Sequence, residues 1–283
     1  MTARDQLCGQ VAAQLRTMSN PGGPLHTDSD RSTNRLYATS PTRSEFQLDA
    51  VDWYLSLVEE APSQGGRSVL LTSGPPGAGK STLLDGDQLS DYRRLDADVL
   101  KDYLIEQAMA EGIYDDLLAT QLSDGANIAP RELASLVHNE STMLLADITN
   151  ICIQRHENVI VEATLRWQDH GPELIARFGR ASYSVMRVLS LDVPQALAEK
   201  QAVSRWWAGR TDWIGGKNSL GGRFMPPTAI ADCFDGNGSS RCVRHALRLP
   251  ALAKPYDLEV KLELYERNSE EGTVHRVIGP PNA

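Results

Sequence analysis

The sequence has little of what would mark a metal-cluster, secreted or membrane protein. Its four cysteines contain no C-x-x-C pair, which argues against a zinc cluster and a disulfide framework. There is no long apolar run and no apolar export-type segment near the start. The net charge of -9 argues against a broad surface for nucleic acid. We therefore expect a cytoplasmic protein that binds neither membranes nor nucleic acid.

The order of elements predicts an α/β fold with an N-terminal extension. We expect residues 1–63 to be a helical, partly disordered extension, with helices over 3–18 and 45–60 and a polar linker over 19–42. In 64–283 strands alternate with helices, which predicts a parallel sheet with helices on both faces. The expected strands are 68–73, 93–98, 158–164, 183–191 and 258–267, and the expected helices are 99–109, 130–156, 168–178 and 193–207.

A glycine-rich turn follows the first of these strands and fits the pattern G-x-x-x-x-G-K-[ST]. We call residues 74–82 the P-loop. In such a loop backbone N–H groups surround the phosphates of ATP or GTP, the lysine reaches the β and γ phosphates, and the serine hydroxyl ligates Mg²⁺. The alternative is an ordinary glycine turn. The predicted binding residues are Gly74, Pro75, Pro76, Gly77, Ala78, Gly79, Lys80, Ser81 and Thr82, with Ser81 at the metal.

Polar residues at two later strand ends are candidates for the phosphoryl acceptor side. Asp96 and Asp98 lie at the end of the second strand, where one carboxylate could take the proton of an attacking hydroxyl or simply cap the next helix. Glu162 and Thr164 end the third strand and suit sugar hydroxyls, although Glu162 also suits the metal side. Glu140 falls within the apolar stripe of the helix over 130–156, which indicates a polar cavity, a partner or a route to solvent.

Residues 204–227 combine three tryptophans, five glycines and four cations, which are Arg205, Arg210, Lys217 and Arg223. Arginines next to glycines suit a mobile lid that closes over a transferring phosphate and neutralises its charge. The tryptophans suit stacking on a base or anchoring to the core. We therefore predict a lid over about 205–227.

With these motifs in hand, the chain resembles the zeta toxin family of P-loop small-molecule kinases over about residues 68–267. The resemblance rests on GPPGAGKST, LDADVLKDYL, VHNESTMLL, VIVEATLR and GGRFMPP in this order. It implies an Mg²⁺-dependent kinase that phosphorylates the 3'-hydroxyl of UDP-N-acetylglucosamine and so blocks cell-wall synthesis. It also implies a small antitoxin protein as partner.

The resemblance further assigns roles to individual residues. Asp98 would be the base, with Arg205 and Arg223 as the two arginines that clamp the phosphate. Arg210 is the alternative for the first of them. The interval between Arg205 and Arg223 is longer than in short family members, and Arg210 lies nearer to Arg223. The substrate-binding residues would be Asp98, Glu140, Glu162 and Thr164. Ala163 departs from the family pattern, which has glycine between the acid and the threonine.

Two other functions remain open on the sequence alone. A P-loop kinase of the same design could act on another small metabolite. A nucleotide-gated switch would bind nucleotide without transferring phosphate, and its acidic charge and N-terminal helices would suit a protein partner.

Overall fold

The computed structural model describes residues 2–58, 62, 65–84, 89–236, 239–269, 272 and 275–278. Its contacts divide the chain into two compact units. The helical unit comprises Met1–Ser56, Ala97–Asp147 and Val203–Pro226, and the sheet unit comprises Leu57–Asp96, Ile148–Ala202 and Pro227–Ala283. The predicted boundary between residues 63 and 64 lies outside the described residues. The division into an extension and a kinase domain stays a prediction.

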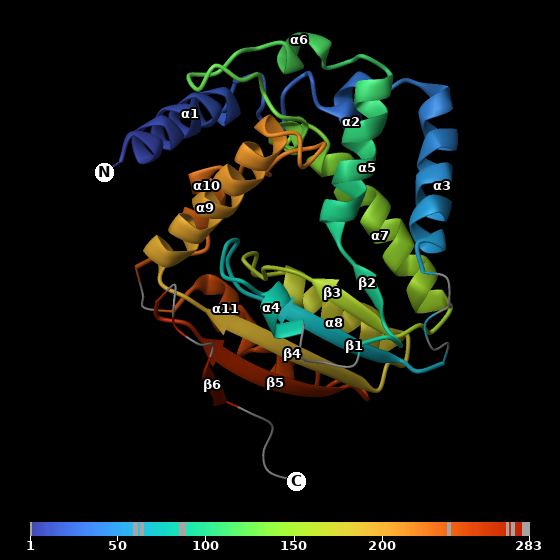
Figure 1. Cartoon of the computed structure of the whole chain (residues 1–283). Coiled ribbons are helices and arrows are strands. Elements are labelled where there is room, and N and C mark those ends of the chain that lie inside the picture. Colours follow the sequence, from blue (N-terminus) through green and yellow to red (C-terminus); the bar gives the residue numbers. More distant parts are fainter. Residues whose placement is uncertain are drawn as a thin grey trace. The chain divides into compact units, whose positions relative to one another are not determined.

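The sheet unit is built on six strands in the order β2-β3-β1-β4-β5-β6 (Figure 1). The first five run parallel, and β6 is antiparallel to β5. Parallel neighbours joined by helices are what the alternating pattern predicts, so the α/β fold class is confirmed. The strands are β1 (Ser68–Ser73), β2 (Arg93–Leu95), β3 (Val159–Glu162), β4 (Val185–Asp192), β5 (Glu259–Glu266) and β6 (His275–Ile278).

The centre of the sheet is apolar because its strands are buried on both faces. In β1 every residue after Ser68 is buried. Leu70 packs with Ile160 of β3 and Leu189 of β4 in one core cluster. The register pairs Thr72 of β1 with Glu162, the last residue of β3. The carboxyl ends of these two strands therefore lie side by side, directly before the P-loop.

The sheet unit contains short helices, and two long helices continue from one unit into the other. The short ones are α4 (Ser81–Leu84), α8 (His170–Arg180), α10 (Pro227–Ala231), α11 (Arg241–Ala246) and α12 (Leu249–Leu252). The long ones are α7 (His138–Gln154) and α9 (Gln195–Ile214). A single helix over 130–156 was expected, but residues 130–133 form the 3-10 helix η1 (Pro130–Leu133). The Ala129 N–H bonds to the Glu132 carboxylate there, and the chain turns before α7 begins.

The helical unit gathers the N-terminal segment around its own core. Its helices are α1 (Ala3–Ser19), α2 (Thr33–Leu36), α3 (Pro41–Ser56), α5 (Ala97–Ala110) and α6 (Asp115–Leu118). Val11 and Leu15 of α1 pack in one cluster with Trp206 of α9 and with Phe224. The helix expected over 3–18 is present, and the one expected over 45–60 begins earlier, at Pro41.

The polar segment 19–42, expected as a linker or as disorder, is folded onto this core. Leu25 is fully buried in the cluster, and its carbonyl oxygen accepts a hydrogen bond from the Ser135 hydroxyl at 2.5 Å. Ser32 and Thr33 are also fully buried. Successive backbone turns pair many N–H groups of this segment, and Arg31 donates two hydrogen bonds to Asp116 of α6.

The segment predicted as a lid is partly helical. Its first residues, through Ile214, belong to α9, and the loop that follows carries the buried side chains Leu220 and Phe224. A Cβ on Gly209 would lie 2.7 Å from the Cα of Gly222, and one on Gly222 would lie 2.0 Å from the Trp206 carbonyl oxygen. These two glycines therefore allow close packing of loop on helix. The closing motion of a lid stays a prediction.

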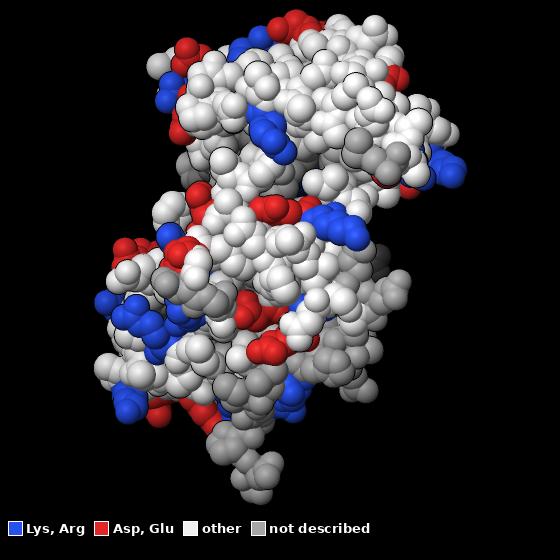
Figure 2. All heavy atoms as spheres, turned by 90° about the vertical axis from the view of Figure 1, so that its left-hand side faces the viewer, with Lys and Arg blue, Asp and Glu red and all other residues white. Residues whose placement is uncertain are grey.

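Two observations concern membranes and surface charge. Within the described ranges, every helix is too short or too polar to cross a bilayer. On the face in Figure 2, acidic and basic side chains are interspersed among neutral ones. Such mixing is typical of a solvated surface.

Candidate active site

The P-loop leaves β1 and enters α4, which is the structural context that the motif requires. Gly77 shows why a glycine is needed. Its φ is 81°, and a Cβ there would lie 2.3 Å from the carbonyl oxygen of Ala198 in α9. Any side chain would strain the backbone and push the loop away from the helix. The glycine at this position therefore allows the backbone of the loop to pass close to α9.

Lys80 is held over the loop by the loop's own backbone. Its Nζ donates hydrogen bonds to the carbonyl oxygens of Gly74 at 2.9 Å and Pro75 at 3.2 Å. The ammonium group is therefore positioned among backbone groups of the phosphate-binding turn. Phosphate oxygens are stronger acceptors for a cation than neutral carbonyls. This geometry suits a lysine that binds the β and γ phosphates.

Ser81 and Glu162 offer oxygen ligands of the kind that Mg²⁺ prefers. Ser81 is the exposed first residue of α4, and Glu162 ends the strand next to β1. Magnesium is usually held by one or two protein oxygens together with substrate phosphates and water, so no dedicated cage is required. The Arg94 side chain donates a hydrogen bond to Glu162. These residues fit the ion, and the binding of a sugar hydroxyl by Glu162 stays a prediction.

Thr164 lies beside the start of the P-loop. Its carbonyl oxygen accepts hydrogen bonds from the Gly74 N–H at 3.3 Å and from the Ser73 hydroxyl at 3.4 Å. Its hydroxyl accepts one from the Arg166 N–H at 3.3 Å. The segment after β3 is therefore tied to the nucleotide loop through its backbone.

Asp98 begins a chain of alternating charges in the helical unit. The Arg223 guanidinium contacts Asp98 Oδ2 at 2.6 Å and Asp102 Oδ1 at 2.9 Å. Lys101 donates to Asp98 Oδ1 at 2.9 Å, and Arg131 binds Asp102 through two hydrogen bonds. Asp98 is the second residue of α5, and its side chain makes ion pairs with two cations.

Electrostatics keep Asp98 ionised. Burial alone would raise the pKa of this carboxyl, but Lys101 and Arg223, with a further contribution from Arg205, bring the pKa below its ordinary value. The three residues predicted as base and clamping arginines therefore influence one another within the helical unit. The carboxylate is therefore in the ionised form that a general base requires, and the two cations paired with it make it a weaker base than an isolated aspartate. Arginine is a residue type that stabilises negative charge.

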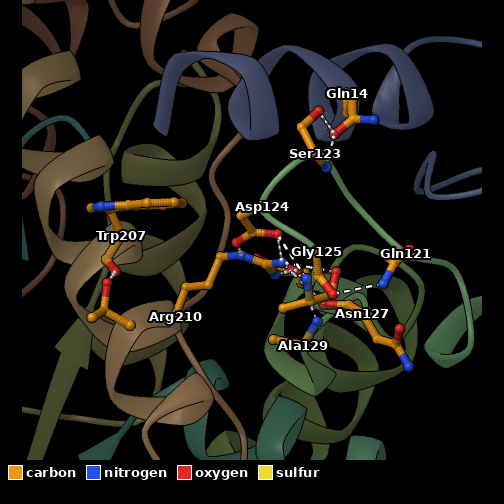
Figure 3. A network of polar contacts seen from close by, with 12 residues as sticks. Gln14, Gln121, Ser123, Asp124, Gly125, Asn127, Ala129, Trp207 and Arg210 are labelled. Carbon is orange, nitrogen blue, oxygen red and sulfur yellow. Dashed lines mark hydrogen bonds and ion pairs between the residues drawn. The ribbon is translucent and has the colours of Figure 1, made fainter. Parts of the chain in front are cut away.

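Arg210, the alternative clamping arginine, is fully buried and occupied (Figure 3). Its Nε and Nη2 donate to Asp124 at 2.7 and 2.8 Å, and its Nη1 donates to Glu132 at 2.8 Å. A further hydrogen bond joins Nη2 to the Asn127 carbonyl oxygen at 3.1 Å. Arg205 is exposed on the same helix. The geometry therefore favours Arg205 over Arg210 as the first clamping arginine.

Glu140 is buried with partners of its own. Its carboxylate accepts two hydrogen bonds from Arg43, both at 2.7 Å, and one from Gln47 at 3.0 Å. Burial opposes the charge, but these donors hold the pKa of Glu140 below its usual value. The contacts tie α3 to α7, and a part in substrate binding stays a prediction.

The predicted residues divide between the two units. Lys80, Glu162 and Thr164 belong to the sheet unit, and Asp98, Glu140, Arg205 and Arg223 belong to the helical unit. No expectation was drawn from the sequence for Asp102, which binds Arg223, or for Arg131, which binds Asp102. Asp102 lies four residues after Asp98 in α5 and hence on the same helix face, a signal that was available.

The fold and the loop define a nucleotide-binding protein of the P-loop kinase-like class. The sheet order and the strand–loop–helix context carry this assignment. The chain belongs to the zeta toxin family, because the family model described as "Zeta toxin" matches residues 52–270. The resemblance drawn from the motifs is thereby confirmed, and it supports a kinase-like toxin function.

A comparison with solved structures agrees on the fold. A chain from the PezAT chromosomal toxin-antitoxin system of the human pathogen Streptococcus pneumoniae matches with a TM-score of 0.54 and 15% sequence identity. The match covers 79% of this chain and 76% of that one. Among curated proteins no sequence matches.

Proposed function

We propose that this protein transfers the γ-phosphoryl group of ATP or GTP to the 3'-hydroxyl of UDP-N-acetylglucosamine. The observation that carries the proposal is the ionised Asp98 held by Arg223 and influenced by Arg205, in a chain that also has a complete P-loop. A switch needs the loop but has little use for such a carboxylate and arginine set. The chemistry of phosphoryl transfer to an alcohol uses both.

Each part of the chain has one task in this reaction. Lys80 and the P-loop backbone bind the β and γ phosphates, and Ser81 ligates Mg²⁺, which neutralises the phosphate charge when bound. Asp98 accepts the proton of the sugar hydroxyl as that oxygen attacks phosphorus. Arg205 and Arg223 stabilise the negative charge on the transferring group. Glu162 and Thr164 bind the sugar nucleotide.

A small antitoxin protein is the proposed partner. Membership of the zeta toxin family supports this, as does the matched chain from a toxin-antitoxin system. An inhibitor of a kinase acts most directly by covering its nucleotide site.

Labelled ATP tests the proposal. The purified protein is incubated with Mg²⁺ and UDP-N-acetylglucosamine, and in parallel with a bacterial metabolite extract, and the labelled product is identified. The matched variants are Asp98→Asn and, as control, Asp52→Asn on the exposed side of α3. We expect phosphorylated UDP-N-acetylglucosamine with the native protein and the control only. A different labelled metabolite would correct the acceptor, and nucleotide binding without any product would favour the switch.

A further inference from the structure

Arg267, the first residue after β5, reaches the P-loop from a strand that the motif does not include. Its Nη1 lies 3.1 Å from the position that a Cβ on Gly79 would occupy. Its own N–H donates to the carbonyl oxygen of Asp192 at 3.1 Å, which anchors its backbone at the end of β4. The guanidinium is therefore positioned against the phosphate-binding loop by the sheet itself.

Gln201 of α9 links this guanidinium to the loop a second time. In the orientation that satisfies both neighbours, its amide nitrogen donates to the Gly77 carbonyl oxygen at 2.6 Å and its amide oxygen accepts from Arg267 Nη1 at 3.3 Å. A neutral amide oxygen is a weak partner for a cation compared with a carboxylate. The contact orients Arg267 but does not neutralise it.

The charge of Arg267 has no carboxylate partner in the part of the chain that the structure describes. Arg93 and Arg187 of the same sheet are paired with Glu157 and Glu263. Arg267 is half-buried, and its Nε is fully buried without a hydrogen-bond acceptor. A buried donor on a charged group costs free energy unless an acceptor is supplied. An anionic ligand at the loop would supply the missing negative charge next to Nη1.

We infer that Arg267 binds the phosphate groups of the nucleotide held in the P-loop, as a second cation beside Lys80. The inference rests on the proposed function only in assuming that the loop binds a nucleoside polyphosphate. The contact is part of nucleotide binding rather than of transfer. It therefore contributes to the affinity for ADP as well as for ATP, and for inorganic tripolyphosphate as well as for nucleotides.

Calorimetric titration with Mg²⁺-ADP and with inorganic tripolyphosphate tests this. The variants are Arg267→Gln, which removes the charge, and Arg267→Lys, which keeps it. The control is Lys261→Gln, which removes an exposed charge from β5, the strand that precedes Arg267. We expect Arg267→Gln to lower the affinity for both ligands about tenfold. Arg267→Lys should retain most of the native affinity, and the control should bind both ligands as the native protein does.

Three results would overturn the inference. One is native ADP affinity in Arg267→Gln. Another is equal impairment of the Gln and Lys variants, which would mean that Arg267 only shapes the loop. The third is a native protein that binds neither ADP nor tripolyphosphate, which would remove the proposed function as well. If the native protein binds both ligands but phosphorylates no acceptor, the proposed function fails, while a selective loss in Arg267→Gln still supports the phosphate contact.

Discussion

Replacing Arg210 by methionine should destabilise the helical unit without touching any proposed reacting group. The guanidinium is fully buried between Asp124, whose side chain is 4% exposed, and Glu132, whose side chain is 0% exposed. The substitution leaves two carboxylates without their cation. Removing one partner of a buried ion pair costs roughly 3–5 kcal/mol. That is a large part of the roughly 5–15 kcal/mol by which domains are stable.

The loss should depend on pH in a defined direction. Burial raises the pKa of Glu132, and Arg210 is the main group that opposes this rise. Without Arg210 the pKa in the folded state rises further above the unfolded value. The folded state then binds more protons than the unfolded state, so stability falls as pH rises through this interval. We therefore expect a larger loss at about pH 8 than at about pH 5.

Urea unfolding followed by tryptophan fluorescence measures this, because Trp206 lies in the same core and donates its Nε1 hydrogen to Glu132 at 2.8 Å. The matched control is Arg205→Met, the same change on the exposed side of α9. It should alter stability by less than about 0.5 kcal/mol. Adding Glu132→Gln to Arg210→Met should recover part of the loss, since it removes a stranded charge. A loss under about 1 kcal/mol at both pH values would refute the reasoning.

Three further outcomes concern the proposed reaction. Asp98→Asn should lower the transfer rate by about 10² to 10⁴ while nucleotide affinity stays unchanged. Since the pKa of Asp98 is lowered, the native rate should not decline through this group between about pH 8 and 5. Unchanged transfer would leave Asp98 with only its ion pairs to Lys101 and Arg223. Arg205→Ala should reduce kcat by about 10² or more with native stability, and a change confined to KM would contradict a transition-state role. Gly77→Ala should weaken ADP binding at least about tenfold because the added Cβ clashes with the Ala198 carbonyl oxygen. Gly9→Ala is the control and should leave ADP binding unchanged, since Gly9 has open space around it. Equal ADP affinity in the two variants would disprove the packing argument.

The parts of the fold that depend on neighbouring residues could be predicted from the sequence. β1 spans 68–73 as expected, because a short apolar run before a glycine turn is a local signal. The P-loop is recognisable for the same reason, since its spacing follows from the phosphate groups that it binds. The end of α9 was missed because the charged Arg210 interrupts the apolar face that Trp206 and Trp213 share at helical spacing. The packing and ion pairs of the helical unit extend the helix to Ile214.

The partners in buried ion pairs could not be predicted, because the sequence does not distinguish a solvated glutamate from one that is paired with a distant arginine. Arg43 and Glu140 are 97 residues apart, and only the fold makes them neighbours. The same holds for Arg210 and Asp124. Glycine is ambiguous in a similar way, since the glycines taken as a sign of mobility include Gly209 and Gly222, which also lie where backbone packs on backbone.

The helical unit is assembled from three separated stretches of chain, and this constrains how the protein can be made. During translation the first 56 residues leave the ribosome long before residues 203–226, which carry Trp206 and Phe224 of their shared core. Until then α1 and Leu25 lack the part of their core that residues 203–226 supply, and the Glu132 carboxylate lacks its ion-pair partner Arg210. A nascent chain stalled before residue 203 would therefore expose apolar surface and an uncompensated acid at the same place, which makes it a natural substrate for chaperones and proteases.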